Sequence, residues 1–179
     1  MVVYILPLYN GVSMMAIEEW SFPDSVFACD ACLHGLGGVC GDQFFHAVFP
    51  TFIKKKNLHI NCLEILAIVV SLRLWADLFY GKRILVYCDN ESSVQVLNTG
   101  STKDVFMQSC LREICFHAAL GHFEIRAKHN QGEVNRLPDY LSRWNSHLKF
   151  RSLFREATWD KNLSQVEVHD EYFKFVHDW

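Results

Sequence analysis

The feature that most limits the possible folds of this chain is residues 25–49, where three short apolar segments follow one another closely. The segment 25–31 predicts a strand, and Gly35, Gly37 and Gly38 permit a tight turn into a second strand near residues 38–40. The dipeptide GD (41–42) is a hairpin signal, after which QFFHAVF (43–49) predicts a third strand. Because such short connections join antiparallel neighbours, these segments predict an antiparallel meander.

After the meander, helical and strand patterns alternate. Apolar residues at helical spacing begin at Asn61 and predict a long helix ending near Gly81, followed by an apolar strand over 82–89. Two helices are expected next, over 91–100 and 101–121, before the alternating segment HFEIRAKH (122–129), which predicts a strand, and a last helix that starts near Asp139.

Ser101 is expected to be the N-cap of the 101–121 helix, with Asp104 as its capping-box partner. The order of elements predicts an α/β fold with a five-stranded mixed sheet flanked by helices. In that sheet, three antiparallel strands are followed by two parallel strands.

The size and composition of the chain indicate one globular domain with an added tail. The 179 residues are half apolar, and the net charge of −3 argues against a strong electrostatic grip on nucleic acid by the whole surface. Seven cysteines, mostly in apolar segments, indicate reduced thiols and therefore an intracellular protein of the cytoplasm or nucleus. No secretory signal is recognised, and the longest apolar run carries three charged residues, so no membrane partner is expected.

Asp30 is the anomaly of the first predicted strand, because it follows the apolar residues VFAC without a break. A carboxylate in apolar surroundings is destabilised by several kcal/mol unless something compensates it. Three explanations are open: a bound metal, a C-x-x-C pair formed by Cys29 and Cys32 with an incidental aspartate, or a strand that simply ends in water.

Three further acids occupy comparable places, at the start of a predicted helix or the end of a predicted strand. They are Glu64, Asp89 and Asp139. Four carboxylates brought to one sheet edge would repel one another unless cations hold them, and hard divalent ions with oxygen ligands suit such a site. Two such ions about 4 Å apart support phosphodiester cleavage by activated water.

Each acid also has an ordinary structural interpretation. Glu64, three residues after Asn61, fits a capping-box partner, and Asp89 and Asp139 could each be only the cap of the helix that follows. Asp30 has no such alternative, because a cap role does not fit an acid inside a strand.

Four segments carry a resemblance to ribonuclease H domains of retroelement polyproteins. DACLHGLGGV (30–39) resembles the first-strand motif of that family, with Cys32 in place of the usual Ser, and LEILAIVVSLRLW (63–75) resembles its Glu-centred helix. GKRILVYCDN (81–90) resembles the strand with the third acid, and KHNQGEVNRLPDYLSR (128–143) resembles the closing His, Gly-x-x-Asn and acid motif. The flanking segments are most similar to tyrosine-recombinase (DIRS-like) retrotransposons.

The resemblance implies a ribonuclease H-like fold and an endoribonuclease that cuts the RNA strand of RNA–DNA hybrids during reverse transcription. Asp30, Glu64, Asp89 and Asp139 would bind two Mg²⁺ ions, which Mn²⁺ can replace, and His129 would assist proton transfer or product release. The reverse transcriptase domain of the same polyprotein would be a partner. Substrate contacts are assigned to Asn61, Asn90, Lys55 and Asn135, although Asn61 is equally well explained as an N-cap and Lys55 as part of a solvated loop.

The resemblance also divides the chain. Residues 1–24 would connect to the polymerase, 25–144 would form the ribonuclease H domain, and 145–179 an aromatic-rich extension that packs on it. Arg143, Lys149, Arg151 and Arg155 form either a basic flank or only a solvated face. A catalytically silent scaffold or binding module of the same fold remains the alternative function, and a transposase or exonuclease of the same superfold is a third.

Two departures from the family pattern bear on activity. Pro138 stands where the family has a small residue, and Glu91 adds an acid where cellular relatives have a neutral amide. The interval between Asp89 and Asp139 also leaves little room for the basic protrusion with which some relatives grip hybrids. We therefore expect weak substrate binding, low activity of the chain alone, and a preference for Mn²⁺.

Overall fold

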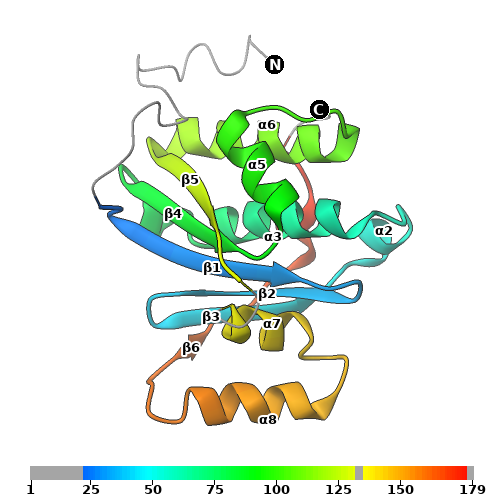
Figure 1. Ribbon diagram of the computed structural model, residues 1–179, viewed down its shortest axis with the longest axis vertical. Coiled ribbons are helices and arrows are strands. Elements are labelled where there is room, and N and C mark those ends of the chain that lie inside the picture. Colours follow the sequence, from blue (N-terminus) through cyan, green and yellow to red (C-terminus); the bar gives the residue numbers. More distant parts are fainter. Residues whose placement is uncertain (1–21, 132–134, 177–179) are drawn as a thin grey trace.

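A six-stranded mixed sheet forms the centre of the fold (Figure 1). The structure, a computed structural model, describes residues 22–131 and 135–176. Its strands lie in the order β5-β4-β1-β2-β3-β6. They are β1 (Ser25–Ala31), β2 (Gly35–Cys40), β3 (Gln43–Val48), β4 (Arg83–Cys88), β5 (Glu124–His129) and β6 (Ser164–Gln165).

The strand directions confirm the predicted α/β class and mixed sheet. β1, β2 and β3 pair antiparallel, and β4 and β5 continue the sheet parallel to β1. The predicted number of five strands is wrong, because β6 pairs with the outer edge of β3 in parallel. β6 has only two residues, both polar and exposed, so no apolar pattern marked it.

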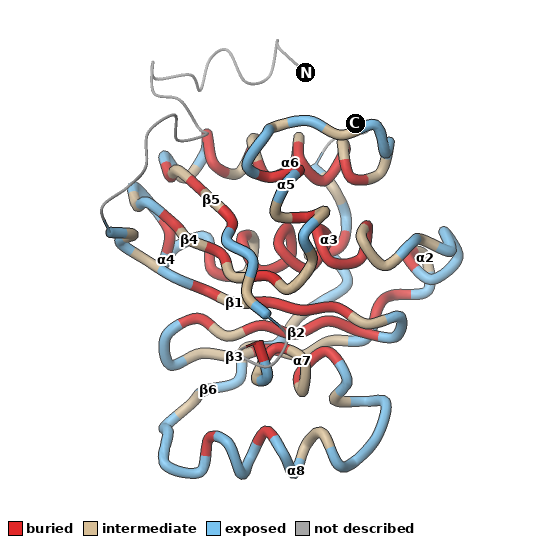
Figure 2. The backbone as a smooth tube through the Cα atoms, in the orientation of Figure 1, coloured by how far each residue is buried: buried red, intermediate tan, exposed pale blue. Residues whose placement is uncertain are grey.

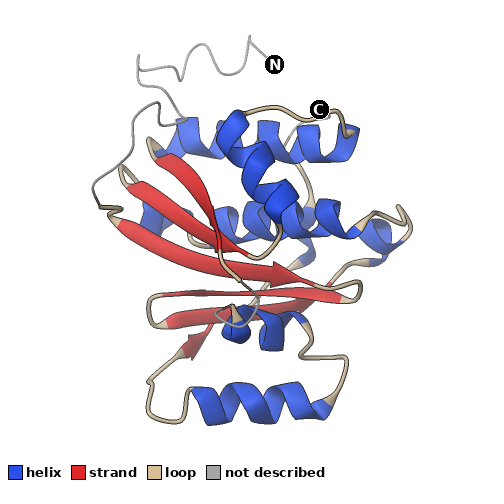
Figure 3. Ribbon diagram, in the orientation of Figure 1, coloured by secondary structure: helices blue, strands red, loops and turns tan. Residues whose placement is uncertain are grey.

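Helices cover both faces of the sheet (Figure 3). α3 and α6 lie on one face, with α4 and α5 beside them, and α7 and α8 lie on the other (Figure 1). The helices are α2 (Thr51–Lys54), α3 (Ile60–Leu74), α4 (Ala76–Phe79), α5 (Glu91–Thr99), α6 (Val105–Gly121), α7 (Arg136–Ser142) and α8 (Leu148–Ala157), with a 3₁₀ turn, η2 (Asp170–Phe173). Within the described ranges, no helix combines the length and apolarity needed to cross a bilayer.

α3 is the central helix of the core. It is buried from Cys62 to Leu72, with every side chain in that stretch enclosed by the sheet, α6 and η2 (Figure 2). Directly after α3, the buried ring of Trp75 contacts the rings of Phe27 and Phe45 at centroid distances of 6.0 and 5.4 Å. The predicted helix therefore stops earlier than expected, and a separate short helix, α4, follows Trp75.

The glycines of the first motif have a different role from the predicted one. Gly35, Gly37 and Gly38 lie within β2 rather than in the turn that precedes it. A Cβ atom on Gly37 would lie 2.2 Å from Cβ of Leu141, and one on Gly35 would lie 3.0 Å from the Ser142 carbonyl oxygen. The missing side chains therefore let α7 approach the backbone of β2, which places α7 against the end of β1.

Three predicted helix starts are corrected. α3 begins at Ile60, with His59 as its N-cap, because the His59 ring accepts the Asn61 backbone N–H. α6 begins at Val105, and its cap is Asp104 itself, which accepts the Met107 N–H at 2.8 Å. α7 begins at Arg136 rather than near Asp139, so Asp139 lies in its first turn.

The C-terminal residues pack on both sides of the sheet. Phe154 of α8 is buried against Phe44 of β3 at a centroid distance of 4.9 Å. On the opposite face, the backbone N–H of Val176 donates to both carboxylate oxygens of Glu113 at 3.1 Å, and Arg73 donates to the carbonyl of Tyr172 at 3.4 Å. Residues 1–21, most of the proposed connection segment, lie outside the described residues.

Candidate metal centre

Asp30 occupies the middle of the sheet, as the last residue but one of β1, and only 3% of it is exposed. Its Oδ2 is buried and has no hydrogen-bond partner among the described residues. The pKa of Asp30 is raised to about 7, chiefly by burial and further by the charges of Asp89 and Asp139, although the neighbouring Ser142 side chain acts in the opposite direction. This burial is incompatible with a strand that simply ends in water.

The C-x-x-C explanation of Asp30 also fails. Cys29 and Cys32 are free thiols in different surroundings. Cys29 is fully enclosed, which raises the pKa of its thiol well above the ordinary value, whereas the Cys32 thiol donates to the Ser142 carbonyl at 3.2 Å. Alternate strand positions point the two side chains to opposite faces, so they do not form one site.

The Glu64 carboxylate contacts the end of β1 from α3, the helix packed on the sheet. Glu64 is 4% exposed, and its Oε2 accepts the backbone N–H of Ala31 at 3.2 Å. The pKa of Glu64 is raised to about 10 by burial and then by the charges of Asp30 and Asp89. Because its carboxylate bonds to β1 and not to the start of its own helix, the capping-box interpretation is wrong.

Asp89 and Asp139 complete the cluster from β4 and α7. Asp89 follows β4 directly and is half-buried, and its helix-cap interpretation is wrong because Asn90 caps α5 by accepting the Ser93 N–H. Asp139 lies inside the first turn of α7, so it is not the cap of that helix. Its Oδ1 accepts a hydrogen bond of 2.6 Å from Nε of Arg143.

The four acids fit a divalent cation site. Two of them, Asp30 and Glu64, are almost fully buried, and one buried carboxylate oxygen has no donor among the described residues. The charges of Asp30, Asp89 and Asp139 act on these two buried acids. Burial of several carboxylates with one partly exposed arginine as the nearby counter-charge leaves negative charge that a cation would neutralise. Oxygen-only ligands of this kind suit Mg²⁺ or Mn²⁺. Asp30, Glu64, Asp89 and Asp139 would hold the ions.

Cys88 and Ser142 are two further members of this centre that the sequence reasoning did not identify. Cys88 is buried, its thiol lies 3.9 Å from Oε2 of Glu64, and ligand atoms of Glu64, Cys88 and Asp89 lie within 4.8 Å of one another. Burial raises the pKa of the Cys88 thiol, so the thiolate that a metal would need is disfavoured. Its position as the residue before Asp89 on a buried strand is the only sequence signal for it.

His129 lies next to the cluster, at the end of β5 rather than in a loop. It is exposed, and its Nε2 lies 3.1 Å from the backbone carbonyl oxygen of Asp89. An exposed imidazole in this place can take up or release protons to water, as a proton-transfer group requires. Residues 132–134, which belong to the closing motif, lie outside the described residues.

Asn61 and Asn90 form a hydrogen-bonded pair beside the acids. Nδ2 of Asn90 donates to Oδ1 of Asn61 at 2.9 Å, and Nδ2 of Asn61 donates to the Ser92 hydroxyl at 3.2 Å. This polar group links the start of α3, which carries Glu64, to the residue after Asp89. The structure therefore brings both predicted substrate contacts to the edge of the acidic cluster.

Asn135 and Lys55 have other environments. Asn135 is 1% exposed and its Nδ2 donates to the Cys29 carbonyl at 3.2 Å, which ties the start of α7 to β1. This contact supports the scaffold directly. Lys55 is exposed at the end of α2, and no described interaction connects it with the acids.

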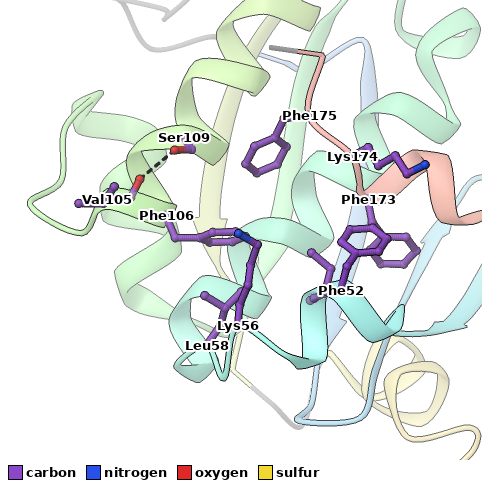
Figure 4. A pocket seen from close by; sticks show the side chains of 10 residues that line it. Phe52, Lys56, Leu58, Val105, Phe106, Ser109, Phe173, Lys174 and Phe175 are labelled. Atoms are coloured by element: carbon purple, nitrogen blue, oxygen red, sulfur yellow. Dashed lines mark hydrogen bonds between the residues drawn. The ribbon is translucent and has the colours of Figure 1, made fainter. Parts of the chain in front are cut away.

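A separate apolar groove of about 690 Å³ is lined by residues of α2, α6 and η2 (Figure 4). The rings of Phe52, Phe106, Phe173 and Phe175 surround it, and Lys56 extends along one side. None of the four acids lines this groove, so it is distinct from the candidate metal centre.

No protein-family model matches this chain, and no curated protein matches it.

Proposed function

We propose that this protein is a metal-dependent endoribonuclease of ribonuclease H-like fold, which hydrolyses the RNA strand of RNA–DNA hybrids. The observation that carries the proposal is the clustering of four acids from β1, α3, α7 and the end of β4. The charges of Asp89 and Asp139 act on Asp30, and the charges of Asp30 and Asp89 act on Glu64. The buried Oδ2 of Asp30 has no donor among the described residues. The order of the five longer strands, with helices on both faces, agrees with this fold. The resemblance of the motifs to retroelement ribonuclease H domains supplies the substrate class.

The chemistry divides between the ions and the residues. When bound, two divalent ions would activate a water and stabilise the oxygen that leaves the phosphodiester. His129, exposed beside Asp89, is placed to move a proton to or from solvent. Asn61 and Asn90 present amide groups at the edge of the cluster, where they can contact 2′-hydroxyl groups of the RNA strand. The products would carry 5′-phosphate and 3′-hydroxyl ends.

The same proposal places the chain in a DIRS-like retroelement polyprotein. Its reverse transcriptase domain would be the neighbouring partner, and the activity would operate inside the cell, in the cytoplasm or nucleus. Residues 25–144 would carry the activity, and 145–179 would be an aromatic-rich C-terminal extension that packs on that domain.

A cleavage assay tests the proposal. A hybrid labelled on its RNA strand is incubated with Mg²⁺ or Mn²⁺ and the wild type, Asp30→Asn, Asp89→Asn, or the control Asp42→Asn, which changes an exposed turn residue. We expect cleavage by the wild type and the control, and loss of at least about a hundredfold in the two active-site variants. Equal cleavage by Asp30→Asn and the wild type would refute the assignment.

A further inference from the structure

The end of α7 and the start of α8 form a basic-aromatic surface beside the candidate metal centre. We define this α7–α8 surface as Tyr140, Arg143, Lys149 and Phe150. It lies in a basic part of the chain, because residues 136–161 contain six Lys and Arg residues and three acids, whereas the whole chain has a net charge of −3.

The ring of Phe150 organises this surface. Nζ of Lys149 lies 4.9 Å from its centroid and Cζ of Arg143 lies 5.7 Å from it, while the Tyr140 ring lies 6.4 Å away. Lys149 is exposed, and about half of the Arg143 side chain is exposed. Two cations thus lie close to the ring of Phe150, which is itself partly exposed, an arrangement suited to phosphates with stacked bases or sugars.

α8 is fixed in place, so this surface has a defined position. Phe154, on the inner side of α8, is buried and contacts the rings of Phe44 and Trp144 at 4.9 and 5.7 Å. The Arg151 Nε donates to the Trp144 carbonyl at 2.9 Å, and the Trp144 ring stacks on His46 of β3 at 4.3 Å. These contacts attach α8 to the sheet through the outer strand β3.

The surface is continuous with the acidic cluster through Arg143. Its Nε bonds to Oδ1 of Asp139, and its guanidinium lowers the pKa of Asp30. Since the cluster is acidic, it does not attract a phosphate backbone without its ions. A basic surface in direct contact with one of its carboxylates would offset that repulsion.

We infer that the α7–α8 surface binds the sugar-phosphate backbone of the RNA–DNA hybrid on the Asp139 side of the metal centre. The inference rests on the proposed function, which supplies the hybrid as ligand. Lys149 and Arg143 contact phosphates, and Phe150 stacks against a base or sugar. α8 thus binds the nucleic acid in place of a basic protrusion, for which the interval between Asp89 and Asp139 leaves little room.

Binding measurements on the full chain test this inference. Asp30→Asn is combined with Lys149→Glu, with Phe150→Leu, or with the control Lys161→Glu, which makes the same charge change at an exposed position beyond the C-terminal end of α8. Fluorescence anisotropy of a labelled hybrid is followed in EDTA over a series of salt concentrations. We expect Lys149→Glu to weaken binding about three- to tenfold and to reduce the slope of log K against log salt by about 0.9 for each lost phosphate contact. Lys161→Glu should change binding less than about twofold, as expected for an exposed charge away from the contact.

Phe150→Leu separates the aromatic contribution from the ionic one. Leucine keeps an apolar side chain but removes the ring, so we expect weaker binding with an unchanged salt slope. Equal effects of Lys149→Glu and Lys161→Glu, or no effect of Lys149→Glu, would overturn the inference.

The inference and the proposed function can fail separately. With Asp30 intact, Lys149→Glu should raise KM for the hybrid and leave kcat unchanged, which identifies a residue that binds the substrate equally in the ground state and the transition state. If the wild type cleaves the hybrid but binding does not depend on Lys149, only the inference about the α7–α8 surface is refuted. If binding depends on Lys149 but no cleavage occurs, that inference is supported and the proposed endoribonuclease activity is refuted.

Discussion

Replacing Asp30 with asparagine should stabilise the metal-free protein at alkaline pH. The pKa of Asp30 is raised from 3.8 to about 7 in the folded state, chiefly by burial. When the pKa of an acid is higher in the folded protein than in the unfolded chain, the protein is most stable below the unfolded pKa. Its free energy of unfolding then falls as the pH rises from the unfolded pKa through the folded pKa. For Asp30 this window extends from about pH 4 to about pH 7.

The size of the effect follows from the shift in pKa. A rise in pKa from 3.8 to about 7 corresponds to ~4 kcal/mol of destabilisation by the ionised carboxylate at pH 8. Asp30→Asn removes this charge in a group of similar shape, so the free energy of unfolding should rise by as much as ~4 kcal/mol, or about 8–16 °C in Tm. At pH 4 the Asp30 carboxyl is already neutral, and the variant and wild type should have nearly the same stability.

Urea unfolding in EDTA at pH 4 and pH 8, followed by tryptophan fluorescence, measures this difference. Asp42→Asn is the matched control, because Asp42 is exposed in the turn between β2 and β3. Adding Mg²⁺ or Mn²⁺ should then stabilise the wild type more than Asp30→Asn. A variant that is less stable than the wild type at pH 8 would refute the argument that burial destabilises the ionised Asp30 carboxylate.

Three further predictions follow from the packing and the chemistry of the centre. Gly37→Ala should lower the free energy of unfolding by about 3 kcal/mol or more and reduce cleavage, because its Cβ would lie 2.2 Å from Leu141 Cβ and displace α7; urea unfolding that matches the wild type would contradict this. Cys88→Ala should retain the Mn²⁺-dependent rise in Tm, whereas its loss would identify the thiol as a ligand. Cleavage by the chain alone should be low and stronger in Mn²⁺ than in Mg²⁺, and vigorous cleavage in Mg²⁺ at physiological salt would contradict this.

The sheet was predictable where the sequence pattern and burial agree. β1 to β5 bear apolar residues that the sheet buries, and the short links between the first three strands fix their antiparallel order. β6 has no such pattern, since its hydrogen bonds go to backbone carbonyls, such as the one from Ser164 N–H to the Asp42 carbonyl. Strand pairing without side-chain burial leaves no signal in the sequence.

Helix starts were predicted less well, because a residue of a type that favours N-caps can make other hydrogen bonds in the folded protein. Asn61 is a favoured N-cap residue, but its side chain bonds to Asn90 and Ser92, and His59 caps α3. Which residue caps the helix therefore depends on tertiary hydrogen-bond partners, and a local sequence pattern does not contain them. The glycines of β2 are a similar case, since the space they leave is taken by α7, about a hundred residues later in the chain.

Two acids of the candidate centre stood out in the sequence because each breaks a local pattern, whereas Asp89 and Asp139 were predicted from the order and spacing of the four acids. Asp30 interrupts an apolar strand, and Glu64 is a lone acid in an otherwise apolar helical stretch. Cys88 and Ser142 conform to their surroundings, so only the packing shows that they face the carboxylates.

A structure of Asp30→Asn beside one of the wild type, each crystallised with Mn²⁺ and an RNA–DNA hybrid, tests the central claim most directly. Anomalous scattering from manganese locates the ions. We expect two peaks about 4 Å apart in the wild type, held by Asp30, Glu64, Asp89 and Asp139 with a phosphate of the RNA strand against them. Loss of at least one peak is expected in the variant. Wild-type crystals with bound hybrid and no manganese at these four acids would contradict the account.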